Sequence, residues 1–203
     1  MTTQYVNTRQ ICKYQTGKNL IEFNDRMSQA DAENAGHIHS RYSKIKVVGK
    51  DYSKGTGEKA VDVELNLDPS TVKTLVEMVF SGERINFKEQ KILAHKKDDD
   101  GYSKVTNINM YYNDKMRLPW NIVLENGRGI AETQKTGGTA MKKGSYKKDQ
   151  EVKIFMDDMS FKKMLKQLMD YIHYFELTAY ARLMKERSAL EEKFKKQNEE
   201  KAS

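Results

Sequence analysis

The chain has 203 residues, a length that fits one or two domains. Its 36 Lys and Arg residues exceed its 29 Asp and Glu residues, giving a formal net charge of +7, and hydrophobic residues make up 37%, enough for a buried core. No apolar run approaches the roughly 18–20 residues that span a bilayer, and the single cysteine, Cys12, excludes an internal disulfide and a cysteine-based zinc site.

The first 83 residues read as four strands followed by a helix. We predict strands over 4–14 and 19–25 around a tight turn, then a polar loop over 26–40. Strands over 42–48 and 61–67 follow, because apolar and polar residues alternate in both.

A helix is predicted directly after the strand over 61–67. Asp68 is a favourable N-cap, Pro69 suits the first helical position, and Gly82 marks the end. Between them lies an apolar stripe at helical spacing: Val72, Leu75, Val76 and Val79.

The second half repeats this plan. Its predicted strands cover 85–96, 103–112, 117–124 with an extension over 128–136, and 152–156, and a turn is expected at 98–101. The strand over 85–96 is expected to be bulged, because its apolar set changes phase between Phe87 and Ile92. A long helix begins near Asp158, with this apolar stripe: Phe161, Met164, Leu165, Leu168, Ile172 and Phe175.

A gapless shift of 89 residues superimposes the two halves in pattern. It pairs Val63 with Val152, Asp68 with Asp157, and Val76 with Leu165. We therefore predict an α+β fold in which tandem ββββα units, about 1–83 and 84–180, form two antiparallel sheets with two packed helices. The two units make one domain, 1–180, and residues 181–203 form a polar helical extension of a long C-terminal helix.

The segment Leu67–Leu75 (Leu-Asp-Pro-Ser-Thr-Val-Lys-Thr-Leu) is similar to the strand-to-helix junction of the coactivator family called positive cofactor four. Members of that family are ββββα units that dimerise and bind single-stranded nucleic acid. Two such units in one chain resemble the Whirly fold, and Lys54–Ala60 is a loose echo of a Whirly motif. The resemblance implies a Whirly-like single-stranded-DNA-binding protein of a phage or bacterial mobile element, acting in a bacterial cytoplasm.

The excess positive charge is concentrated in one third of the chain. Residues 84–150 carry 14 basic and 8 acidic side chains, a net +6. Within 135–148, three glycines accompany basic residues and one tyrosine, so this stretch is either a mobile basic arm that follows a phosphate backbone or a solvated hairpin loop. Its candidate contacts are Lys135, Lys142, Lys143, Tyr146, Lys147 and Lys148.

Further candidates come from strand alternation, which separates side chains that face the core from those that face outward. Trp120 lies on the strand face that is expected to meet the core. Phe155 faces outward, as either a platform for a base or a contact between copies of the chain. Basic side chains bind the phosphates of a single strand, and aromatic rings stack on its bases. On this basis the remaining predicted nucleic-acid contacts are Tyr42, Lys44, Lys46, Lys54, Lys104, Tyr111, Arg117 and Arg128.

Signatures of an enzyme are absent from the sequence. No phosphate-binding loop has the required glycine spacing, and His37 with His39 has no nearby set of further ligands, so we expect no catalysis, no metal and no cofactor. The N-terminus has no signal segment, which favours the reducing cytoplasm.

The predicted function is non-catalytic, largely sequence-independent binding of single-stranded DNA in replication, recombination or DNA transfer. The alternatives are an RNA-binding or transcription-regulatory module, and an assembly protein of a phage or mobile element. We expect a homo-oligomer, since Tyr180, Leu183, Leu190 and Phe194 give the C-terminal helix a sparse heptad stripe.

Overall fold

The first half of the chain forms one antiparallel sheet and one helix. The structure is a computed structural model, and it describes residues 7–30 and 38–202. The first sheet has the strand order β1-β2-β3-β4, and a short 3₁₀ turn precedes its last strand. The elements are β1 (Gln10–Gln15), β2 (Asn19–Arg26), β3 (Lys44–Asp51), η2 (Gly57–Lys59), β4 (Val61–Leu67) and α1 (Pro69–Phe80).

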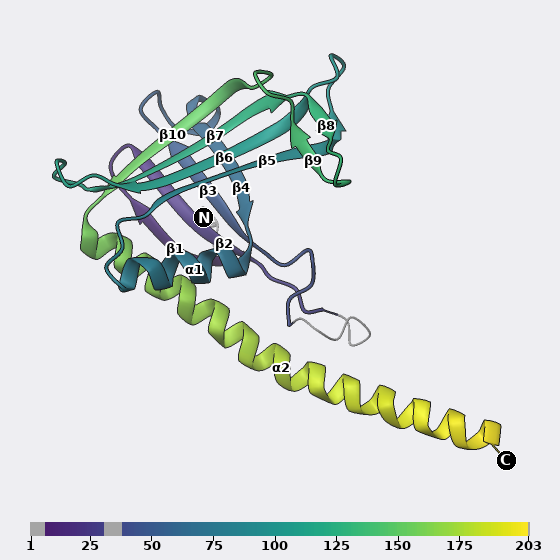
Figure 1. Cartoon of the computed structure of the whole chain (residues 1–203). Coiled ribbons are helices and arrows are strands. Elements are labelled where there is room, and N and C mark those ends of the chain that lie inside the picture. The colour runs from purple at the N-terminus through teal and green to yellow at the C-terminus, as the bar shows by residue number, and fades with distance from the viewer. Residues whose placement is uncertain (1–6, 31–37, 203) are drawn as a thin grey trace, which may run out of the picture.

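The second half builds a second sheet of order β10-β7-β6-β5, a small β8–β9 hairpin and a long helix (Figure 1). The predicted α+β class, with two antiparallel four-stranded sheets and two helices, is therefore confirmed. The elements are β5 (Asn86–Lys97), β6 (Ser103–Tyr112), β7 (Trp120–Gly129), β8 (Ala131–Thr133), β9 (Thr139–Met141), β10 (Lys147–Met156) and α2 (Asp158–Ala202).

Several predicted boundaries were wrong. β1 begins at Gln10 rather than residue 4, and residues 4–6 and 31–37, which include His37, lie outside the described residues. β3 begins at Lys44 and continues to Asp51, so Tyr42 lies in the preceding turn and not on a strand face.

The bulge of β5 lies elsewhere than predicted. Phe87 and Ile92 pair in one regular register with Met110 and Val105, and the shift occurs only beyond Leu93. Phe87 and Ile92 thus point to opposite faces, and Ile92 lines a hollow with the β9 residues. The apolar set changes phase because the β8–β9 hairpin covers part of the outward face.

The segment 135–148 is ordered as a hairpin rather than as an arm without secondary structure. β8 and β9 pair from Ala131↔Met141 to Thr133↔Thr139, and Gly137 in the connecting turn adopts a φ of 81°. The remainder of the segment leads into β10, which begins at Lys147 and not at residue 152.

One core lies between the inward faces of the two sheets and the two helices. The predicted alternation holds over 63–67 of β4 and 152–156 of β10, where every second side chain is buried, and Trp120 is buried as expected. The Trp120 ring stacks on Phe161 at 4.0 Å, and its Nε1 donates to Asp158 at 3.0 Å. The largest buried side chains are Phe23, Phe161, Ile21, Ile45, Leu67, Ile108, Met110, Ile122, Leu124, Ile154, Met156 and Leu168.

Cys12 belongs to this core and not to any reactive site. It is 4% exposed, and its Sγ lies 3.7 Å from the carbonyl oxygen of Met164. Burial raises the pKa of the thiol to about 12, so the reactive thiolate is scarce at neutral pH.

The two acids that the 89-residue shift pairs have different roles. Asp157 caps α2, because its Oδ1 accepts the backbone N–H of Ser160 at 2.9 Å. Asp68 stands at the same position before α1 but makes no side-chain cap bond. It binds Lys44 at 2.6 Å and Lys91 at 3.0 Å instead, and so ties β3 of the first unit to β5 of the second.

The charge state of Asp68 follows from these contacts. Burial opposes ionisation of the carboxyl, but the hydrogen bonds from Lys44 and Lys91 outweigh it and lower the pKa of Asp68.

The helix α2 is one unbroken element of 45 residues, about 68 Å at 1.5 Å per residue. Its first half packs with α1 and β1, and its C-terminal half projects away from the sheets (Figure 1). Leu183 is still buried, whereas residues 191–200 are all exposed. None of the helices in residues 7–30 and 38–202 has the apolar length that a bilayer crossing requires.

A partly buried carboxylate anchors the middle of α2. The Glu176 carboxylate accepts hydrogen bonds from His39 Nε2 at 2.9 Å and from Lys73 Nζ at 3.0 Å. The His39 ring stacks on Phe175. Burial opposes the charge of Glu176, but the two partners outweigh it and lower the pKa of the carboxyl. This cluster holds α1, α2 and the segment 38–43 together.

The two sheets approach closely at Gly49 of β3. A Cβ atom on Gly49 would lie 2.6 Å from Leu124 Cδ1 and 3.3 Å from Val152 Cγ1, both in the second sheet. A side chain at this point would force the sheets apart. Gly49 is therefore required for the spacing of the core and not for a turn.

Gly49→Ala is expected to destabilise the fold by about 1–3 kcal/mol, the usual cost of overpacking a core. Denaturant unfolding followed by circular dichroism measures this change. Gly17→Ala is the matched control, since a Cβ there meets nothing within 4 Å. Equal stability of Gly49→Ala and the unsubstituted chain would contradict the close approach of the sheets.

Candidate nucleic-acid interface

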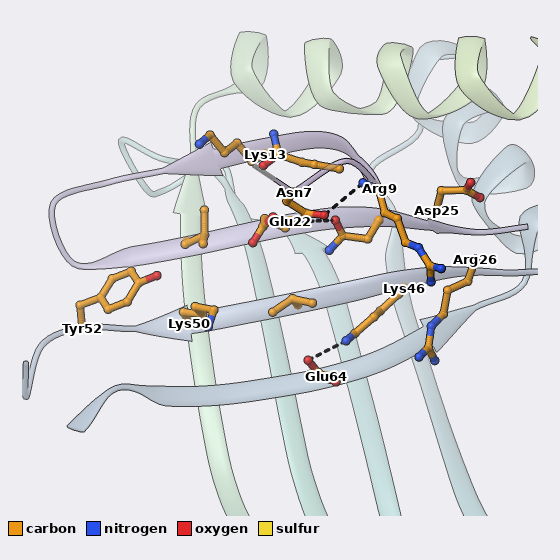
Figure 2. A pocket seen from close by; sticks show the side chains of 14 residues that line it. Asn7, Arg9, Lys13, Glu22, Asp25, Arg26, Lys46, Lys50, Tyr52 and Glu64 are labelled. Atoms are coloured by element: carbon orange, nitrogen blue, oxygen red, sulfur yellow. Dashed lines mark hydrogen bonds and ion pairs between the residues drawn. The ribbon is translucent and has the colours of Figure 1, made fainter. Parts of the chain in front are cut away.

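The outward face of the first sheet is hollowed, with a volume of about 720 Å³ (Figure 2). Its floor contains Leu20 and Val48, whose side chains point away from the core because strand residues alternate. Both are almost fully covered by the longer polar side chains around them. The lining residues are Asn7, Arg9, Gln10, Lys13, Leu20, Glu22, Asn24, Asp25, Arg26, Lys46, Val48, Lys50, Tyr52 and Glu64.

The lining holds five cations and three acids, a net charge of +2 (5 − 3). Two of the cations are paired across the strands: Lys46 Nζ lies 2.7 Å from Glu64, and Lys50 Nζ lies 2.9 Å from Asp62. Lys50 and Asp62 stand directly opposite in the β3–β4 register. The hydrogen bond that Lys50 donates to Asp62 raises the pKa of Lys50, and burial opposes the rise. Half of each acid's side chain is exposed, so these pairs exchange with solvent ions.

The other three cations, Arg9, Lys13 and Arg26, are exposed and make no ion pair within the described residues. Arg9 and Arg26 lie toward the Lys46 end of the face, and Tyr52 lies beside Lys50 at the other end (Figure 2). The hollow therefore has free positive charge at one end and a half-buried ring at the other.

An amide bridge closes one wall of the hollow. Asn7 Nδ2 donates to Glu22 Oε1 at 3.0 Å and to Asn24 Oδ1 at 2.8 Å. The Asn7 Oδ1 accepts the backbone N–H of Arg9 at 3.1 Å, which fixes the chain just before β1. Glu22 is thereby held by an amide, and it makes no ion pair with a neighbouring cation among the described residues.

Four predicted contacts belong to the first sheet or its loops. Lys46 lines the hollow, and Lys54 is exposed in the loop after β3. Lys44 is bound to Asp68 and to the carbonyl of Arg41. Tyr42 is 68% exposed, and the Arg41 guanidinium lies 4.6 Å above its ring.

Three predicted cations meet in one row at the far end of the second sheet. The register pairs Lys104 with Arg128 and Arg128 with Lys147. Arg128 is neutralised by Asp98 at 3.6 Å and Asp149 at 3.3 Å. Lys147 Nζ lies 4.3 Å above the Tyr102 ring, a cation–π contact, and Lys104 is exposed.

Of the other predicted contacts in residues 135–148, some are free and others are held by acidic side chains. Lys135, Lys142 and Lys143 are exposed on the β8–β9 hairpin and just beyond it. Lys148 is paired with Glu151 at 2.9 Å and Glu125 at 3.5 Å. The Tyr146 hydroxyl donates to Glu125 at 3.0 Å, so its ring is held against the sheet. Burial and the bond to Glu125 raise the pKa of Tyr146.

The last two predicted contacts, Tyr111 and Arg117, lie at the opposite end of the second sheet from Lys104. Tyr111 is half-buried on the outward face of β6, and Arg117 is exposed in the loop before β7. The structure thus distributes the predicted contacts over both sheets and several loops, and it brings only part of them together.

The sequence interpretation missed the cations of the hollow except Lys46. Lys50 continues the outward set of Lys44 and Lys46, and only the early predicted end of β3 hid it. Arg26 is the last residue of β2, one position beyond the predicted end of that strand. To place Arg9 and Lys13 on this face, the position of β1 had to be known.

The described residues include no cluster that could form a metal site. Among the described residues, no three His, Cys, Asp or Glu side chains gather closely enough to hold an ion. The Asp98–Gly101 segment is a turn, as predicted, in which Asp98 Oδ1 accepts the N–H groups of Asp100 and Tyr102.

The chain matches no known protein family, no curated protein and no solved structure.

Replacing both acids that neutralise the hollow, Asp62→Asn with Glu64→Gln, is expected to tighten polyanion binding several-fold. The change frees Lys46 and Lys50, and each added phosphate contact steepens the salt dependence by about 0.7 for a single strand. Fluorescence anisotropy at several salt concentrations, with heparin and an oligonucleotide as ligands, measures both.

The matched control removes the same two charges elsewhere, as Glu191→Gln with Glu192→Gln on the exposed end of α2. If both double variants bind alike, the hollow is not where the polyanion lies.

Proposed function

We propose that this chain binds single-stranded nucleic acid, DNA in the first instance, without catalysis and largely without sequence preference. Replication, recombination and DNA transfer are the processes that require such a protein. The observation that carries the proposal is the hollow on the first sheet, where three free cations and two exchangeable ones surround an apolar floor and end at Tyr52.

The chemistry of this face suits an unpaired strand. Sequence-independent binding needs a positive groove along the backbone and flat side chains for the bases. The half-buried ring of Tyr52 offers contact to bases, and Arg9, Lys13 and Arg26 offer contact to phosphates. A duplex presents only its phosphates to a face of this kind, because its bases are stacked inside.

The order of elements agrees with the resemblance found in the sequence. Each half places four antiparallel strands before a helix, with the β8–β9 hairpin as an insertion in the second half. We propose a Whirly-like identity on this basis, and a bacterial or phage-derived cytoplasmic setting with it.

The test is competition among single-stranded DNA, duplex DNA and RNA of one length at fixed salt. Single-stranded DNA is expected to displace a labelled single strand at the lowest concentration. If duplex DNA competes equally well, the chain is a general polyanion binder, and if RNA competes better, the RNA-binding alternative replaces this proposal.

The triple variant Arg9→Gln, Lys13→Gln, Arg26→Gln locates the contact surface. It is expected to weaken single-strand binding at least about tenfold and to reduce the salt slope by up to about 2, because three phosphate contacts are lost. The matched control, Lys135→Gln, Lys142→Gln, Lys143→Gln, removes the same charge from the hairpin region. A larger loss in the control would move the interface to the second unit.

We also propose that α2 joins two copies of the chain. Apolar side chains remain exposed along it, with Leu177 at 59%, Tyr180 at 53% and Phe194 at 60%. Side chains of this size are usually covered when a helix has a partner.

The variant Leu177→Gln, Tyr180→Gln, Phe194→Gln tests this role, because it removes all three exposed apolar side chains and keeps the buried Leu183. Light scattering is expected to show a lower mass than for the unsubstituted chain, with little change in the melting temperature. An unchanged mass would remove the proposal.

A further inference from the structure

The outward face of the second sheet differs in chemistry from the hollow on the first. The register aligns Tyr111 with Asn121 and Asn121 with Phe155, so these three side chains form one row across β6, β7 and β10. The next row inward along the strands is Lys88, Asn109, Val123 and Lys153. Two rings, amides and two lysines occupy these rows, and no acid lies in either.

The exposure of this row is uneven. Phe155 is 37% exposed and Tyr111 is half-buried, but Asn121 between them is only 1% exposed. Asn121 Nδ2 donates to the carbonyl oxygen of Pro119 at 2.9 Å. Its Oδ1 has no hydrogen-bond partner within the described residues. A buried acceptor without a donor is costly, and a ligand that supplies one gains from it.

The corresponding row of the first sheet shows what is special here. The 89-residue shift places Phe155 on Asn66, and Asn66 pairs with Lys46, which pairs with Asn24. The row Asn24–Lys46–Asn66 therefore corresponds to Tyr111–Asn121–Phe155. Where the first sheet has an ammonium between two amides, the second has an amide between two rings.

Lysines are available beside the rings. Lys88 is exposed and makes no ion pair within the described residues, and Lys153 is 53% exposed with a single partner, Glu151, at 3.0 Å. Hydrogen bonds from Lys148 and Lys153, against burial, lower the pKa of Glu151 to about 2. The rings thus lie beside positive charge, with an acceptor for an amino group beneath them.

We propose that this face is a base-binding surface, on which unpaired bases of the bound strand stack on Tyr111 and Phe155 while Lys88 and Lys153 contact phosphates. The inference rests on the proposed single-strand binding and assigns the stacking contacts to the second sheet. A protein partner fits less well, because two rings among amides provide too little apolar area for a stable interface.

The experiment compares two labelled ligands, an oligonucleotide and an abasic oligonucleotide of the same length. The full chain is expected to bind the oligonucleotide more tightly, since stacking on rings adds to phosphate contact. Tyr111→Ala with Phe155→Ala is expected to lose at least about tenfold in affinity for the oligonucleotide, and to bind the abasic ligand as before. Tyr111→Phe with Phe155→Tyr is the conservative control and is expected to retain both affinities.

Photocrosslinking of the unsubstituted chain covers the case in which the alanine variant fails to fold. An oligonucleotide carrying 5-iodouracil is irradiated on the protein, and the modified peptides are sequenced. Adducts at Tyr111 or Phe155 are expected. Adducts confined to other residues, such as Tyr52 of the hollow, would overturn the assignment.

The outcomes separate this inference from the proposed function. If the full chain binds no oligonucleotide, both fall. If it binds and depends on Arg9, Lys13 and Arg26 but not on the two rings, only the base-binding surface falls. If the alanine variant instead changes the mass measured by light scattering, the face is a contact between copies of the chain, which also overturns the inference.

Discussion

The close contact of two sheets through a single apolar layer determines the rest of this molecule. Each sheet has one face in the shared core, and the helices fill the space that the sheets leave at the other end. Gly49 shows how little room remains, because a single methyl group there would collide with Leu124 of the opposite sheet. Since most apolar side chains point inward, the outward faces carry mainly what the alternate residues of each strand provide. In each strand, one set of alternate residues builds the core, and the other set determines the chemistry of the surface.

The two outward faces differ because the duplicated plan has been filled with different residues. In the first sheet, lysines of β3 pair with acids of β4, whereas Arg9 before β1 and Arg26 of β2 make no ion pair among the described residues. In the second sheet, the equivalent positions hold amides and rings, and its strongest charges are tied in pairs such as Arg128 with Asp149. Free cations thus predominate on the first face, and two rings with two lysines lie on the second. The net charge of residues 84–150 does not show which of its cations are unpaired, because acids from several elements neutralise part of it.

Alternation and helix spacing in the sequence were sufficient for the order of strands and helices, the buried Trp120 and the outward Phe155. They were insufficient for contacts that depend on how strands are paired. The bond of Lys50 to Asp62 exists only in one register, and the role of Asp68 as a link between units requires β5 to lie beside β4. The segment 135–148 was ambiguous for the same reason, since glycine and lysine suit a free arm and a hairpin turn equally. Its net charge also concealed the acids from other strands that neutralise part of it.

The unbroken α2 has a mechanical consequence. A flexible tether lets whatever it carries sample all distances up to its length, and the effective concentration falls as the tether grows. A helix of about 68 Å anchored along its first half by buried side chains and by Glu176 behaves as a rod. Anything attached to its far end would be held at a set distance and direction from both sheet faces. Two molecules joined through such rods would present their binding faces at a constant spacing, and that spacing would define the length of strand that both can engage.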